Sequence, residues 1–196
     1  MNQYQHLKQI RSELLYLTII FFVILIISGS TKVDASLKLL PAEILETTTF
    51  PAYLSLTINC VFYIGVMTIL FVIINFITQY HKSEEEYSIF LEGISNVIIT
   101  LCFFEIIKVA ITFMFFDEAL QRVTDVELIN QQIKGSSWWK YDRMIKIITT
   151  IISSLVFFIS CYKKKKTMKF LVMATLIFFC WNNVNCFTLN YFVILL

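Results

Sequence analysis

Hydrophobic residues occur along the chain in long runs that are separated by shorter polar stretches. A helix needs about 20 consecutive apolar residues to cross the hydrocarbon core of a bilayer. Five runs near or above this length lie at residues 14–29, 52–80, 88–116, 144–162 and 169–196. The pattern predicts about five transmembrane helices. Four is the alternative, because the first run is short and asparagines interrupt the last.

The first run also has features of a secretory signal sequence. Lys8 and Arg11 precede it, and Ser28, Gly29 and Ser30 follow its apolar stretch. Small residues are common at the cleavage site of a signal peptide. We expect the segment to remain in the protein as a signal anchor rather than to be cleaved.

Both prolines of the chain flank the polar stretch that follows the first run, at Pro41 and Pro51. Proline is favoured in the first turn of a helix and disrupts a helix interior. Pro51 is therefore expected to begin the second spanning helix, which leaves residues 31–51 as a loop outside the membrane.

The polar stretch between the third and fourth runs contains an amphipathic pattern. Over residues 117–134, apolar side chains recur at helical spacing with charged residues between them. A helix of this kind lies on the membrane surface rather than across it. Gly135 is suited to end such a helix. Trp138, Trp139 and Tyr141 then follow where interfacial aromatic residues are common.

The composition agrees with a membrane protein. Of the 196 residues, 58% are hydrophobic and 15% are charged, whereas soluble domains have about 45–50% and about 25%. So few charged side chains cannot form a polar surface around this many apolar ones. The formal net charge of +2 is too small to indicate a nucleic-acid partner. We therefore predict a single all-α domain, a polytopic integral membrane helical bundle with one additional interfacial helix.

The distribution of basic residues predicts the orientation. Loops rich in lysine and arginine stay in the cytoplasm, and the densest cluster comprises Lys163, Lys164, Lys165, Lys166 and Lys169. With five spans, this cluster places the N-terminus in the cytoplasm, and we expect the membrane to be a bacterial cell membrane. The bias is small, because 8 basic residues then lie inside and 7 outside. The same lysines are candidates for contact with lipid headgroups or with a partner.

The third run carries charged residues inside a predicted span. Glu105 and Lys108 lie near its middle, where a lone charge costs at least about 2.5–3.5 kcal/mol. Because they are three residues apart, they can form an ion pair on one helix. This pair is either structural or a site for a proton or cation. Glu92 and Asn96 lie on the opposite side of the same helix, so we expect this helix to be central in the bundle.

The last run has a polar face made of asparagines. Transmembrane asparagine forms hydrogen bonds between helices and promotes helix association. The candidate interface residues, within the chain or between subunits, are Asn182, Asn183, Asn185 and Asn190. A pore lined by these side chains would require several copies around an axis.

Motifs of membrane enzymes are absent from the sequence. It contains no HExxH, no GxSxG and no glycine-rich phosphate loop. None of its four aspartates lies inside a predicted span, which excludes a catalytic pair inside the membrane. The five cysteines lie in apolar runs without a CxxC pair, so no metal and no cofactor is predicted.

Two functions from different classes fit these features. The first is a non-enzymatic membrane subunit, an anchor or assembly component of a transport, secretion or defence complex. Its partners would be membrane lipids, further copies of the chain and a protein at the cytoplasmic face. The alternative is a small ion or proton channel or transporter that uses Glu105 and Lys108 together with the asparagine face.

Overall fold

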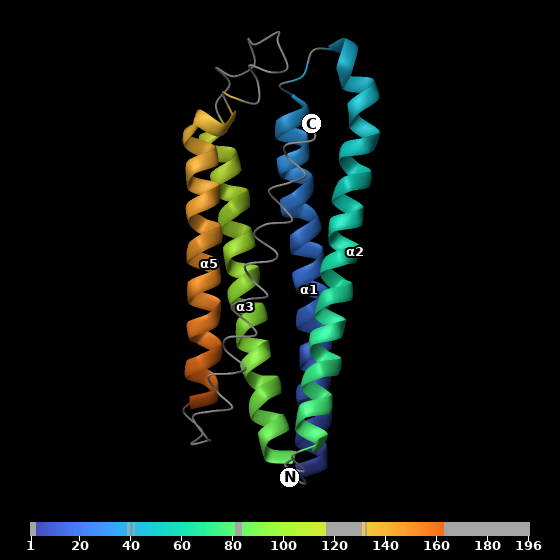
Figure 1. The fold of residues 1–196 in the computed structure, drawn as a ribbon, viewed down its shortest axis with the longest axis vertical. Helices are drawn as coiled ribbons and strands as arrows, with labels where there is room; N and C mark the ends of the chain where they lie inside the picture. The colour runs from blue at the N-terminus through green and yellow to red at the C-terminus, as the bar shows by residue number, and fades with distance from the viewer. Residues whose placement is uncertain are drawn as a thin grey trace.

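A computed structural model of the chain describes residues 3–38, 40, 42–80, 84–116, 131 and 133–162. Nearly all of these residues are helical. Consecutive helices run in opposite directions (Figure 1). The long helices are α1 (Gln3–Leu37), α2 (Ala42–Tyr80), α3 (Glu84–Phe115) and α5 (Ser137–Tyr162).

Three of these helices are long and apolar enough to cross a membrane. The segments are Lys8–Leu37 in α1, Ser88–Phe115 in α3 and Ser137–Tyr162 in α5. The described residues therefore confirm a helical membrane protein, whereas the number of five spans stays a prediction. The last predicted span, 169–196, lies outside the described residues. So does the interfacial helix predicted over 117–134, apart from residues 131, 133 and 134.

The polar stretch between the first two runs is helical over most of its length, so the loop expected at residues 31–51 is wrong. α1 continues to Leu37, because its polar residues have partners on other helices. Lys32 contacts α5, and Asp34 accepts a hydrogen bond from the Tyr53 hydroxyl of α2.

Pro51 lies inside α2 instead of at its start. The helix begins at Ala42, which directly follows the other proline of the chain in the sequence. An interior proline removes one backbone hydrogen bond and costs about 3 kcal/mol. A helix of 39 residues tolerates this cost because its other turns are retained.

The fourth predicted span begins earlier than the apolar run indicates. α5 starts at Ser137 and includes Trp138, Tyr141 and Asp142. Trp138 is only 3% exposed and its indole N–H donates to the Thr112 hydroxyl of α3 at 3.2 Å. Its indole N–H therefore has a partner inside the bundle, whereas its expected position at the membrane boundary stays a prediction. The expectation that no aspartate lies inside a span is wrong, because Asp34 and Asp142 belong to helices that are long and apolar enough to cross a membrane.

α3 is the helix around which the described bundle is organised. It packs between α1 and α5 and also contacts α2 (Figure 1). In the half of the bundle that contains the start of α3, the core is apolar. Its most deeply buried side chains are Leu91, Val97, Ile98 and Phe157.

A close approach between α3 and α5 occurs at Gly93. A Cβ atom at this position would lie 3.1 Å from the Cys161 sulfur and 3.3 Å from Cε2 of Phe157. Small residues let membrane helices pack tightly. Gly93 therefore allows the two helices to meet in the apolar half.

Candidate functional site

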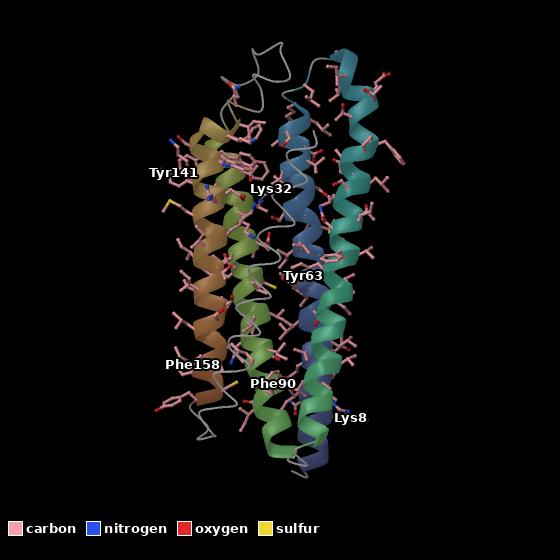
Figure 2. The ribbon with its side chains drawn as sticks, in the orientation of Figure 1. Lys8, Lys32, Tyr63, Phe90, Tyr141 and Phe158 are labelled. Atoms are coloured by element: carbon pink, nitrogen blue, oxygen red, sulfur yellow. The ribbon has the colours of Figure 1, made fainter. Side chains whose placement is uncertain are left out.

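Charged residues from three helices meet in the other half of the bundle. Lys32 comes from near the C-terminal end of α1, and Figure 2 shows it above Phe90, which belongs to the apolar half. α3 contributes Glu105 and Lys108, and α5 contributes Asp142 and Lys146 near its N-terminal end. We call these residues the charged cluster: Lys32, Glu105, Lys108, Asp142 and Lys146.

Asp142 is the centre of one part of the cluster. Its Oδ1 accepts a hydrogen bond from Nζ of Lys32 at 2.5 Å, and its Oδ2 lies 2.8 Å from Nζ of Lys146. The Asp142 side chain is only 6% exposed. Both carboxylate oxygens thus bind a lysine, one from α1 and one from the next turn of α5.

The Lys32–Asp142 pair joins two helices that are not direct neighbours. α1 and α5 each pack against α3, and within the described residues their backbones do not approach each other closely. Because lysine has a long flexible stem, its ammonium can reach across this separation. The ion pair therefore connects α1 to α5 beside α3.

Glu105 and Lys108 form the second part of the cluster. The two side chains make an ion pair on α3, as their spacing allows, and both are largely buried. Glu105 also interacts with the buried side chain of Ser28 on α1. Glu105 therefore links α3 to α1. Both parts of the cluster thus involve α1, through Ser28 in one and Lys32 in the other.

The five charges act on one another through a medium of low polarity. Lys32 interacts electrostatically with every other member of the cluster. Interactions between buried charges are much stronger than those between exposed charges. Removing one partner of a buried pair typically costs 3–5 kcal/mol, because it leaves the other charge uncompensated. The cluster can thus fix the relative positions of three helices, and it can also hold a proton or an ion.

A stripe of buried polar residues continues from the cluster along α5. It follows one helix face at spacings of three and four residues. Its hydroxyl groups donate to backbone carbonyls of the preceding turn, such as Thr149 to Ile145 and Ser154 to Thr150. Such local bonds let small polar side chains be buried. The members of the stripe are Asp142, Lys146, Thr149, Thr150, Ser153 and Ser154.

Lys32, Asp142 and Lys146 are not marked as site residues by the hydrophobic pattern, because it places all three on the side outside the membrane. The signal that finds two of them is the periodicity of α5. Asp142 and Lys146 share a face with Thr149 and Ser153, which a helical projection from residue 137 reveals. No comparable pattern marks Lys32, because its partner is 110 residues away in the chain.

Glu92 and Asn96 lie apart from the charged cluster. Asn96 precedes Glu105 by nine residues, a separation of about 14 Å along the helix. Its amide donates to the Ser160 hydroxyl of α5 at 3.1 Å, and Glu92 is half-buried one turn earlier. The candidate residues of α3 therefore belong to two separate places on the helix.

The remaining candidate residues fall outside the described part of the chain. They are Asn182, Asn183, Asn185, Asn190, Lys163, Lys164, Lys165, Lys166 and Lys169. Among the described residues, no three His, Cys, Asp or Glu side chains are grouped so that they could hold a metal ion. The thiols of Cys60, Cys102 and Cys161 are free.

Comparisons with known proteins give no assignment. No protein-family profile matches the chain, and no curated protein and no solved structure is significantly similar to it.

Proposed function

We propose that the protein is a non-enzymatic integral-membrane subunit that anchors or assembles a larger membrane complex. The observation that supports this proposal is the secondary structure and hydrophobicity of the described residues. They consist almost wholly of long helices, three of which can cross a membrane, and they include no extramembrane domain. A chain of this form contributes position and contacts in the bilayer. A catalytic or sensing activity then comes from the proteins bound to it.

The proposal includes five spans, with the N-terminus in the cytoplasm of a bacterial cell. Lys32 and Lys146 both bind Asp142 inside the bundle. They therefore do not act as loop charges, which are the residues that set orientation. When Lys32 and Lys146 are left out, the predicted loops carry 8 basic residues on the cytoplasmic side and 5 on the outer side. The lysine-rich loop is the proposed contact for a partner at the cytoplasmic face.

Reciprocal purification from native membranes tests the proposed function. The tagged chain is extracted in a gentle detergent, and any protein recovered at fixed stoichiometry is then tagged in turn. The proposal predicts that each tagged protein recovers the other, or that tagged chains recover untagged copies. Recovery of the chain alone in both formats would contradict an assembly role.

The alternative function is a small channel or transporter for protons or ions. The charged cluster favours it, because ionisable residues inside a membrane often mark ion or proton paths. Flux through liposomes that contain the native chain, Glu105→Gln or Asp142→Asn tests this function. A transport role predicts loss of flux in the variants, whereas equal flux in all three excludes both residues from any path.

A further inference from the structure

The exposed side of α5 changes sharply in chemistry near its N-terminal end. Lys140 and Arg143 are exposed, and from Met144 onward the exposed side is apolar for about four turns. At 100° per residue, Lys140 lies about 40° and Arg143 about 100° from Met144 around the helix, both on the side where Ile147 lies. They therefore point to the same side as the exposed apolar residues Met144, Ile147, Ile151 and Leu155.

Exposed tyrosines occur at both ends of this apolar face. Tyr141 is 42% exposed and Tyr162 is 57% exposed. They are separated by 21 residues, which corresponds to about 31 Å along a helix. The hydrocarbon core of a bilayer is about 30 Å thick, and tyrosine is enriched at its two boundaries. The tyrosines thus indicate the depth of α5 in the membrane.

This depth places Lys140 and Arg143 at the level of the lipid headgroups. They lie one residue before and two residues after Tyr141, and both are exposed. The helix end that carries them is held in place by α3. Tyr141 packs on Phe115 with ring centroids 4.6 Å apart, and Trp138 is hydrogen-bonded to Thr112.

We propose that Lys140 and Arg143 form a binding site for the headgroup of an anionic phospholipid at the N-terminal end of α5. The two side chains are three residues apart, so they project from neighbouring positions on one helix surface. An ammonium and a guanidinium fork together can bind the oxygens of one phosphodiester. The acyl chains of that lipid would then lie along the apolar face from Met144 to Leu155. Its two residues differ from the lysines between 163 and 169, which the sequence also marks as candidates for contact with lipid headgroups.

Spin-labelled lipids in phosphatidylcholine vesicles test the site with the full chain. Phosphatidylglycerol and phosphatidylcholine probes are compared for the fraction whose motion is restricted by the protein. The native chain is expected to prefer phosphatidylglycerol roughly fivefold, and the double variant Lys140→Gln/Arg143→Gln is expected to lose most of this preference. The matched control Lys38→Gln/Lys134→Gln removes the same charge from exposed residues at the same end of the bundle and should change the preference little.

The proposal is overturned by the absence of a lipid preference in the native chain, by an unchanged preference in the double variant, or by an equal loss in the control. If the double variant lacks native helicity, the site is tested instead by the salt dependence of the swap Lys140→Arg/Arg143→Lys, which keeps both charges. The swap should retain the preference in 0.05 M salt. Both it and the native chain should lose the preference in 1 M salt, where the Debye length is about 3 Å. A preference that persists in 1 M salt contradicts a site made by these charges.

Discussion

The ammonium of Lys32 in α1 lies 2.5 Å from the carboxylate of Asp142 in α5, although 110 residues separate the two in sequence. Within the described residues, the backbones of α1 and α5 do not approach each other closely. The pair therefore fixes the position of α1 relative to α5. These are the first and the last of the described helices that are long enough to cross a membrane. Lys146 binds the same carboxylate and completes the site.

Replacing Asp142 by Asn should destabilise the protein by about 3–5 kcal/mol, because two buried lysines lose their shared carboxylate. Equilibrium unfolding in mixed micelles, followed by circular dichroism, measures this loss. Glu46→Gln removes an exposed carboxylate from α2 and serves as the control, with an expected change within about 0.5 kcal/mol.

An apolar replacement of the whole site should recover stability. Buried ion pairs are often replaced by hydrophobic residues at little cost. The triple variant Lys32→Met/Asp142→Leu/Lys146→Met should therefore regain at least half of the stability that Asp142→Asn loses. A triple variant as unstable as Asp142→Asn would show that the loss does not come from uncompensated charge.

Gly93→Ala should destabilise the contact between α3 and α5. The added methyl group would lie within 3.1–3.3 Å of Cys161 and Phe157, and overpacking of this kind costs about 1–3 kcal/mol. Gly65→Ala is the matched control, because no heavy atom lies within 4 Å of its Cβ position in the described structure. The same micelle unfolding assay should show a loss only for Gly93→Ala. An equal effect at both positions would contradict the close packing.

The hydrogen bond between Trp138 and Thr112 should be measurable in a double-mutant cycle. Trp138→Phe, Thr112→Val and the combined variant are compared by their free energies of unfolding. A coupling energy of about 1 kcal/mol is expected for one buried hydrogen bond between neutral groups. Strictly additive effects would mean that the indole N–H gains nothing from the Thr112 hydroxyl.

Orientation can be tested with introduced cysteines at opposite ends of α1. Lys38→Cys should react with a membrane-impermeant maleimide in intact cells, and Lys8→Cys should react only after the cells are permeabilised. Both positions are exposed, so reactivity reports the side of the membrane. The reverse result would place the N-terminus outside.

The helical membrane architecture was predictable because it depends on local composition. Long apolar runs favour helices wherever they occur, and α1, α3 and α5 each contain one. The i,i+3 spacing of Glu105 and Lys108 was also readable, since both partners lie on one helix. The central position of α3 followed from polar residues on two of its sides, and its packing against both α1 and α5 agrees with that prediction.

The interhelical parts of the site were not predictable in the same way. Lys32 and Asp142 lie near polar chain segments, so each resembles a loop residue until its partner is known. Trp138 resembles an interfacial tryptophan for the same reason, because only the tertiary structure supplies the Thr112 hydroxyl. These contacts lie near the end of α1 and the start of α5, where both helices extend beyond their apolar runs. Hydrophobic periodicity and the preference of proline for helix starts do not take contacts between helices into account.

Native mass spectrometry of particles extracted from source membranes in polymer nanodiscs tests the proposed assembly role most directly. The measurement gives the mass of the complex without prior removal of its lipids. An assembly role predicts a discrete mass that corresponds to several copies of the chain, or to the chain with a second protein at fixed stoichiometry. A particle that contains one copy of the chain and only lipid would contradict it.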